Sequence, residues 1–117
     1  MPTIRDVVQA LGRRDGVDAV IILGRDGLTI DASIRDGLDA DGLAALIPSV
    51  AASCNRLGNA AARGEFSTGV VEYGRGMAVI TVLTAEVLLA IVVQPEVNIG
   101  ALLYELKRHR SAIAGLL

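Results

Sequence analysis

The chain has 117 residues, a length that favours a single domain, residues 1–117, built around one hydrophobic core. Hydrophobic residues make up 52% of the sequence and aromatic residues only 3%, so this core is expected to be aliphatic. The formal net charge is −2 and no basic stripe with interleaved aromatic residues occurs, which argues against nucleic acid as a partner. The apolar surplus instead predicts an oligomer that buries surface between its subunits.

Two features bear on the cellular compartment. Cys54 is the only cysteine, so no internal disulfide can form, and the first nine residues lack the apolar run of a signal peptide. Both features fit a reducing, cytoplasmic environment. Residues 77–93 are apolar enough to suggest a membrane span, but the segment is short for one and contains Glu86. Its content of Val, Ile and Thr favours strands, so we predict no membrane insertion.

A short helix is predicted at the start of the chain. Thr3 can serve as its N-cap, and Asp6 stands three residues later, which approximates a capping box. Apolar residues then recur at helical spacing until Gly12, where we expect the helix to end.

A hairpin is predicted next, with strands over residues 17–23 and 28–33 and a turn over residues 24–27 that contains an Asp-Gly pair. In the second strand Leu28, Ile30 and Ala32 alternate with polar residues. This alternation is typical of an outer strand with one solvated face and one face toward the core.

A long helix is predicted from Asp39 or Asp41 to Arg63, with either aspartate as its N-cap. One stripe of this helix is apolar: Leu43, Leu46, Ile47, Val50, Cys54, Leu57 and Ala61. A second stripe carries small side chains that would let another helix approach closely: Ala45, Ala52, Asn59 and Ala62, with Ser49 and Asn55 near it. Pro48 lies inside the segment, so we expect either a kink there or a regular helix that starts near it.

Three strands are predicted between residues 65 and 93. The first, over residues 65–73, is partly polar and is expected at the edge of a sheet. Residues 77–84 and 87–93 are nearly continuous apolar runs, which indicates strands covered on both faces. Gly74 and Gly76 flank Arg75 in the first connection, where a tight turn favours residues that accept a positive φ.

A final helix is predicted after Pro95, with Asn98 as its N-cap. Its buried stripe is expected to comprise Ile99, Leu102, Leu103, Leu106, Ile113 and Leu117. Its solvated face is expected to carry Glu105, Lys107, Arg108 and Arg110.

The sequence offers no recognisable set of catalytic or metal-binding residues. His109 is the only histidine and stands among basic residues, without an identifiable nucleophile or carboxylate partner. Cys54 has no second ligand at metal-binding spacing, and Asp39 and Asp41 lack the remainder of a calcium loop. Both glycine-containing turns join strands and lack the form of a phosphate-binding loop. We therefore predict no catalytic, cofactor-binding or metal-binding site.

The two features that remain are an edge strand and a helix face of small residues. An unpaired strand edge can pair with another chain, and a twofold dimer needs only one self-complementary patch. We therefore predict a homodimer whose strands join edge to edge and whose long helices pack side by side. The predicted interface residues are Ala45, Ala52, Asn59, Phe66, Thr68, Val70 and Glu72.

The order and spacing of these segments resemble the roadblock/dynein light-chain (LC7) family over nearly the whole chain. The resemblance rests on DAVIILGRDGLTIDAS (18–33), LAALIPSVAASCNRLGNAA (43–61), GEFSTGVVEY (64–73), MAVITVL (77–83) and VLLAIVV (87–93). It implies a roadblock/profilin-like α/β (α+β) fold of order α-β-β-α-β-β-β-α. In that fold a five-stranded antiparallel sheet lies between the long helix on one face and the two terminal helices on the other.

The resemblance also implies a function. The chain is similar to MglB-type proteins, which are non-catalytic homodimeric partners of Ras-like small GTPases, and to scaffold subunits of eukaryotes. In MglB-type pairs the two long helices form a platform for the GTPase, which predicts partner-binding roles for Ser49, Asn55, Arg56 and Arg63. An arginine-finger role for Arg56 or Arg63 is not expected, because such proteins act by repositioning loops of the GTPase.

Three alternatives stay open at this point. The chain could be a self-assembling scaffold without a GTPase partner, or a small-ligand sensor with an enclosed apolar pocket. An enzyme is the least favoured alternative, because no nucleophile–base pair can be named.

Overall fold

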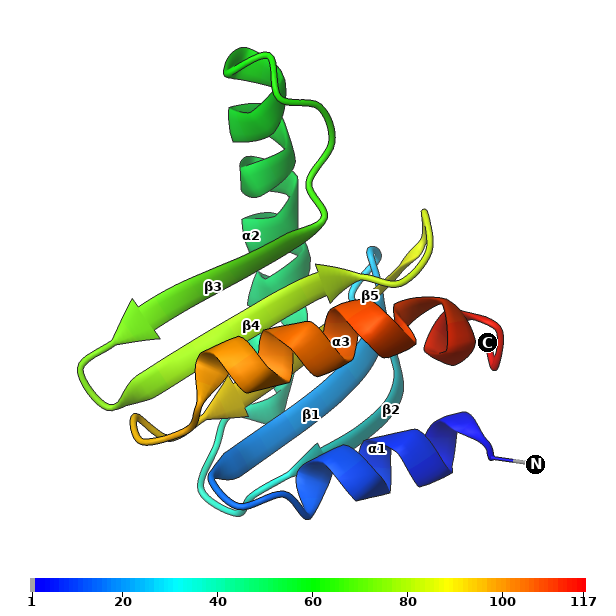
Figure 1. The fold of residues 1–117 in the computed structure, drawn as a ribbon, viewed down its shortest axis with the longest axis vertical. Coiled ribbons are helices and arrows are strands. Elements are labelled where there is room, and N and C mark those ends of the chain that lie inside the picture. The colour runs from blue at the N-terminus through cyan, green and yellow to red at the C-terminus, as the bar shows by residue number, and fades with distance from the viewer. Residues whose placement is uncertain (1) are drawn as a thin grey trace.

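A five-stranded antiparallel sheet separates one long helix from two shorter helices (Figure 1). The computed structural model describes residues 2–117. The elements in chain order are α1 (Ile4–Gly12), β1 (Val17–Gly24), β2 (Thr29–Ile34), α2 (Ala40–Ala60), β3 (Thr68–Tyr73), β4 (Gly76–Val82), β5 (Val87–Val93) and α3 (Ile99–Ala114). This order and architecture confirm the predicted fold.

The strands lie in the order β2-β1-β5-β4-β3, so β2 and β3 form the two edges. Both edge positions agree with the prediction from the polar residues of these strands. The central strand β5 is a continuous apolar run because its two faces are both covered. No helix within residues 2–117 combines the length and apolar character needed to cross a bilayer.

The core has two layers, one on each face of the sheet. Val20, Ile22 and Ile91 belong to the layer beneath α1 and α3. Ile21 and Leu88 belong to the layer beneath α2. Successive residues of one strand thus enter different layers, as the period of two in a β-strand requires.

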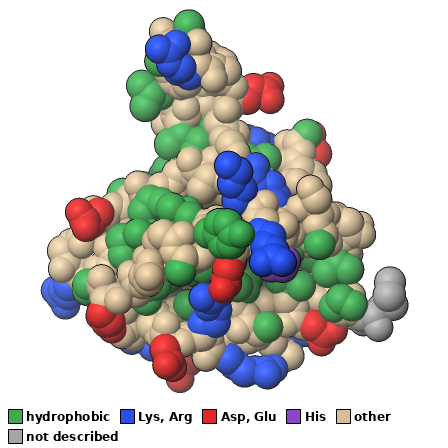
Figure 2. Space-filling model, viewed as in Figure 1, with side chains coloured by type: hydrophobic (Ala, Val, Ile, Leu, Met, Phe, Trp, Pro, Cys, Tyr) green, Lys and Arg blue, Asp and Glu red, His purple; other side chains and the backbone are tan. Residues whose placement is uncertain are grey.

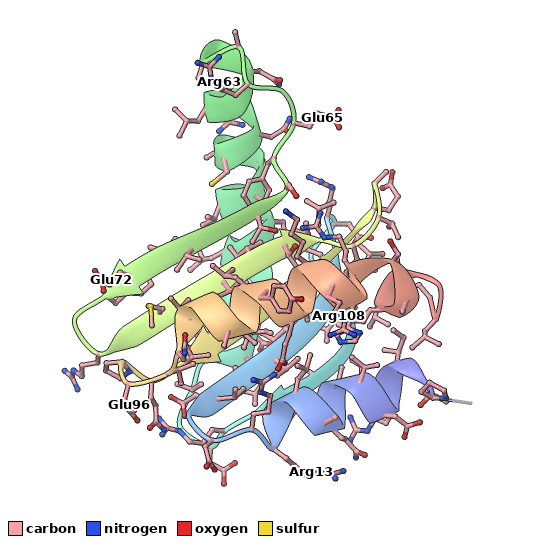
Figure 3. All side chains as sticks on the ribbon, viewed as in Figure 1. Arg13, Arg63, Glu65, Glu72, Glu96 and Arg108 are labelled. Atoms are coloured by element: carbon pink, nitrogen blue, oxygen red, sulfur yellow. The ribbon has the colours of Figure 1, made fainter. Side chains whose placement is uncertain are left out.

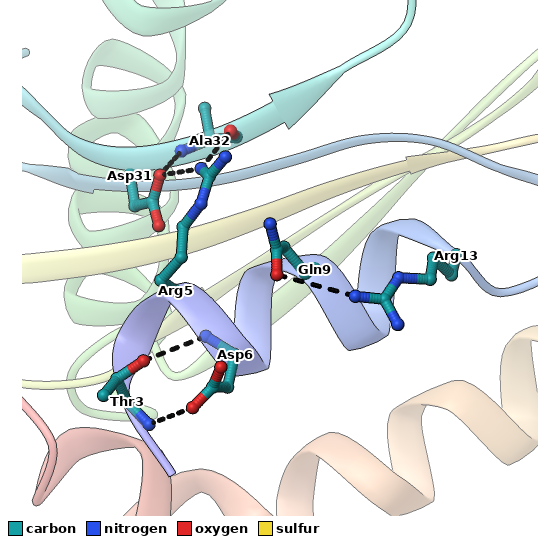
Figure 4. A network of polar contacts seen from close by, with 7 residues as sticks. All are labelled: Thr3, Arg5, Asp6, Gln9, Arg13, Asp31 and Ala32. Carbon is teal, nitrogen blue, oxygen red and sulfur yellow. Dashed lines mark hydrogen bonds and ion pairs between the residues drawn. The ribbon is translucent and has the colours of Figure 1, made fainter.

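The predicted capping box at the start of α1 is confirmed (Figure 4). The Asp6 amide donates to Thr3 Oγ1 at 3.2 Å, and the Thr3 amide donates to Asp6 Oδ2 at 2.9 Å. Arg5 then connects this helix to the sheet, since its guanidinium lies 2.6 Å from the Asp31 carboxylate on β2.

The long helix begins where predicted and ends earlier than predicted. Asp39 is the N-cap and accepts a hydrogen bond from the Gly42 amide at 2.9 Å. The helix runs without interruption through Pro48, so the expectation that its regular part starts there is wrong. It ends at Ala60 rather than Arg63, because Ala62 adopts a positive φ of 57° that turns the chain away.

Three smaller expectations are corrected. Leu28 and Ile30 are exposed, since Leu28 precedes β2 and the β1–β2 register shifts beside Ile30. Leu117 is also exposed, because α3 ends three residues earlier. In the β3–β4 turn only Gly76 has a positive φ, so Gly74 does not need glycine's conformational freedom.

Candidate protein-interaction surface

The helix α2 covers the sheet with a narrower face than its sequence predicts. Ile47 and Ala51 are its buried residues, and Leu43 and Ala44 are packed beside them. Leu43, Ala44 and Ala51 each lie three or four residues from Ile47, so the four residues line one side of the helix. The side chains beneath them on the sheet include Ile21, Ile80 and Leu88.

Three large apolar residues of α2 lie on the outside instead. Leu46 is 64% exposed, Leu57 is 69% exposed and Val50 is also exposed. These three members of the predicted apolar stripe therefore do not face the core, and neither does Ala61, which is exposed beyond the helix. The reason is that α2 has only one sheet face to pack against. Its apolar residues extend further around the helix than the side that contacts this face.

The C-terminal half of α2 extends past the edge of the sheet. Figure 1 shows this half standing beyond β3, with the connection to β3 returning along it. Figure 2 shows the same projection clear of the body, with hydrophobic side chains on its flank. Leu57 belongs to this half, so its exposed side chain has no sheet of its own subunit beneath it.

The edge strand β3 lies beside this projecting helix. Within the sheet β3 pairs with β4 alone, so its other edge carries backbone groups without a strand partner. Thr68 and Val70 face the α3 side of the sheet, where they line one hollow with Leu103. Val70 remains 40% exposed there, and Glu72 follows on the same face by the strand period.

Two of the predicted interaction residues have internal roles. Asn55 Oδ1 accepts a hydrogen bond from the Phe66 amide at 2.9 Å, which holds the connection between α2 and β3. The Phe66 side chain is half-buried against the core layer beneath α2. Both residues thus position the edge strand relative to the helix.

The other predicted residues divide between exposed and half-buried positions. Exposed are Ala45, Ser49, Arg56, Asn59, Arg63 and Glu72; half-buried are Ala52 and Thr68. The Arg56 guanidinium donates to Ser53 Oγ at 3.0 Å along the outer face of α2. Figure 3 places Arg63 at the tip of the projection and Glu72 at the far end of β3. The predicted set is therefore divided between α2, on one face of the sheet, and the edge strand β3, whose Thr68, Val70 and Glu72 face the α3 side.

Arg110 is not on a solvated face, as its sequence context suggested. It is half-buried, and its guanidinium donates to Ser67 Oγ at 2.8 Å and to Thr68 Oγ1 at 3.0 Å. Thr68 Oγ1 lies 2.7 Å from the hydroxyl of the buried Thr81. Arg110 therefore connects α3 to the beginning of β3. Its position four residues after Leu106 and three before Ile113, on the buried stripe, was the sequence signal for this role.

His109, the only histidine, lies apart from this surface. His109 lines an apolar groove of about 420 Å³ between α1 and α3, with Leu11 and Leu116 among its other walls. Glu105 at its rim is ion-paired with Arg14. Within residues 2–117 no three His, Cys, Asp or Glu side chains gather closely enough to hold a metal ion.

Comparison with known proteins identifies relatives of this arrangement. The family model described as the Roadblock/LC7 domain matches residues 3–93, from α1 to the end of β5. Comparison with curated proteins gives no match. Among solved structures, Myxococcus xanthus MglB is similar with a TM-score of 0.86 and 18% identity, over 97% of this chain and 93% of that one.

Two further structures have the same fold. An MglB with a tetrameric arrangement gives a TM-score of 0.83 at 20% identity, over 97% of this chain and 86% of that one. A Roadblock/LC7 domain from Streptomyces avermitilis gives 0.78 at 21% identity, over 90% of this chain and 88% of that one.

Proposed function

This chain belongs to the Roadblock/LC7 family, and from that premise we propose that it is a non-catalytic, homodimeric binding module for a Ras-like small GTPase. The observation that carries the proposal is the exposed apolar face of α2 beside an open strand edge. Leu46 and Leu57 are each more than half exposed on that face. A monomer gains nothing from such residues in water, whereas an interface buries them.

The dimer forms about a twofold axis at the edge strand. Two β3 strands pair antiparallel, which satisfies the backbone groups that β3 leaves without a strand partner. The axis brings both α2 helices to the same face of the joined sheet. The projecting half of each α2 then lies over the sheet of the other subunit and buries Leu57. One self-complementary patch thus uses both exposed features.

The GTPase binds to the outer surface of the paired helices. Ser49 and Arg56 are exposed on α2, and Arg63 lies at its tip, so these side chains remain free to contact a partner. Their mix of hydroxyl and guanidinium groups suits the polar rim of an interface. The regulation acts through loops of the GTPase, as the resemblance to MglB-type proteins implies.

Binding to Ras-like GTPases from the same genome, each loaded with GDP or with a non-hydrolysable GTP analogue, tests the partner. We expect one of them to bind in a nucleotide-dependent way. Arg56→Glu should weaken this binding by about tenfold, because it places a carboxylate on the contact surface. Arg13→Glu, on the exposed end of α1, is the matched control and should leave binding unchanged.

The outcomes separate the two parts of the proposal. A dimer that binds none of these GTPases with nucleotide dependence contradicts the partner and leaves the dimer standing. A chain that stays monomeric contradicts the dimer itself.

A self-assembling scaffold is the second candidate. It is supported by the similarity to an MglB with a tetrameric arrangement. Light scattering over a concentration series distinguishes it, since a scaffold forms species larger than the dimer without added GTPase.

A further inference from the structure

The side of β3 that faces α3 carries a hollow lined by two cations. Its volume is about 380 Å³, and its walls are Ser67, Thr68, Val70, Leu103, Lys107 and Arg110. No acidic side chain belongs to this lining. The hollow opens beside the strand edge at which the proposed dimer forms.

Arg110 lacks a counter-ion in its own subunit. The ion pairs among residues 2–117 are Arg5 with Asp31, Arg14 with Glu105 and Arg35 with Asp18. Arg110 donates only to two hydroxyl groups, and its buried Nε has no hydrogen-bond partner among the described residues. A half-buried guanidinium without a carboxylate is a costly arrangement, because its charge has lost water and gained no opposite charge.

Glu72 carries the opposite charge and likewise has no ion-pair partner among the described residues. It is exposed near the end of β3 and takes part in none of these ion pairs. It faces the same side of the sheet as Thr68 and Val70, since these residues are four and two positions away. Within one subunit, however, it lies away from Arg110 along the strand, because Arg110 contacts Thr68 at the other end.

A twofold axis perpendicular to the sheet removes this separation. With such an axis, the α3 helices of both subunits lie on the same face of the joined sheet. Each residue of β3 then lies opposite a partner residue whose side chain points to the same face. The two residues at the middle of β3 are Val70 and Val71. If Val70 lies on the axis, Glu72 of the partner subunit lies opposite Thr68. If Val71 lies on the axis, Glu72 of the partner subunit lies opposite Val70. Both Thr68 and Val70 line the hollow.

We propose that Glu72 of a second copy enters the hollow and pairs with Arg110, so that the dimer contains two equivalent ion pairs. Opposite residues in an antiparallel pair have Cβ atoms about 4.5–5.5 Å apart, so Glu72 of the partner subunit lies within side-chain reach of Thr68 or Val70. The Arg110 guanidinium is at the same place, since it donates to Thr68 Oγ1 at 3.0 Å. Lys107 adds a second positive charge at the same hollow. This inference rests on the proposed homodimer and names one ion pair at its interface, which both of these registers allow.

The test measures the dimer dissociation constant by sedimentation equilibrium for Glu72→Arg, Glu72→Gln and the unchanged chain. Glu72→Arg should raise the constant by about ten- to a hundredfold, because two like-charge contacts replace two ion pairs in each dimer. Glu72→Gln should raise it less. Glu96→Arg, in the exposed turn before α3, makes the same charge change and should have no effect.

A reciprocal change identifies Arg110 as the contact. Combining Glu72→Arg with Arg110→Glu should restore the dissociation constant to within about threefold of the unchanged chain. If Arg110→Glu fails to fold, Arg110→Gln serves instead. In the Arg110→Gln background, Glu72→Arg should no longer raise the dissociation constant more than Glu72→Gln does. Arg108→Glu is the control on α3 and should not rescue Glu72→Arg.

The possible results distinguish the proposed ion pair from the proposed homodimer on which it rests. A dimer that is equally stable with glutamate, glutamine or arginine at position 72 overturns the ion pair and leaves the dimer in place. An unchanged chain that is monomeric at all concentrations overturns both.

Discussion

Gly76 is a residue at which the β3–β4 hairpin has no room for a side chain. Its φ is +148°, and a Cβ at this position would lie 2.1 Å from the carbonyl oxygen of Val93. That oxygen belongs to the neighbouring strand β5, so relief would require movement of the sheet backbone. Gly74, two residues earlier, has open space around the same position and no positive φ.

Gly76→Ala should therefore lower the free energy of unfolding by about 2–4 kcal/mol, from the backbone clash and the unfavourable φ together. Gly74→Ala should change it by less than about 0.5 kcal/mol, as for an ordinary surface position. Urea denaturation of both variants at one protein concentration measures the difference. Equal effects would show that the hairpin adapts more easily than this geometry allows.

Arg110 shows what sequence reasoning missed at the scale of a residue. Three basic residues in four suggested a solvated face, and for Lys107 and Arg108 the exposure is as expected. Arg110 differs because the helical period returns it to the side that carries Leu106 and Ile113. The sequence contained that periodicity, but the hydroxyl partners, Ser67 just before β3 and Thr68 on β3, are more than forty positions away in the chain.

Among the elements, α2 combines a core face with an exposed apolar face. Ile47 and Ala51 anchor it on the sheet, while Leu46 and Leu57 remain exposed. The sequence could predict the helix, an aspartate cap at position 39 or 41 and the small residues beside it. It could not predict which apolar residues face the core, because the choice depends on how far the sheet extends beneath the helix.

Leu57→Asp should raise the dimer dissociation constant by more than about tenfold, since it places a charge in an apolar contact that occurs twice per dimer. The helix content by circular dichroism should stay the same, because Leu57 is 69% exposed in the single subunit. Leu28→Asp is the matched control, at an equally exposed leucine beside the opposite sheet edge. If the two variants behaved alike, the projecting half of α2 would not be part of the interface.

The strands were more predictable than the helix faces for a physical reason. β4 and β5 are covered on both sides, so once a membrane span is set aside their apolar runs indicate buried strands. The polar residues of β3 likewise indicated an edge before its neighbours were known. A surface helix that will also meet another subunit carries two overlapping apolar patterns, and only the folded subunit separates them.

At the scale of the whole molecule, the exposed features gather on one side. The open edge of β3, the projecting half of α2 and the cationic hollow beneath Arg110 all adjoin the same edge of the sheet. The groove between α1 and α3 lies on the other helices and takes no part in this arrangement. In the proposed dimer a single twofold axis at β3 would use all three features, and the paired α2 helices would then present Arg56 and Arg63 outward.

The central claim is that the chain acts as a twofold dimer joined through β3 and α2. Sedimentation equilibrium of the unchanged chain, over a wide range of concentrations, tests it most directly. The account predicts a species of twice the 12.1 kDa chain mass that dissociates only on dilution. A mass of one chain at every concentration would contradict it.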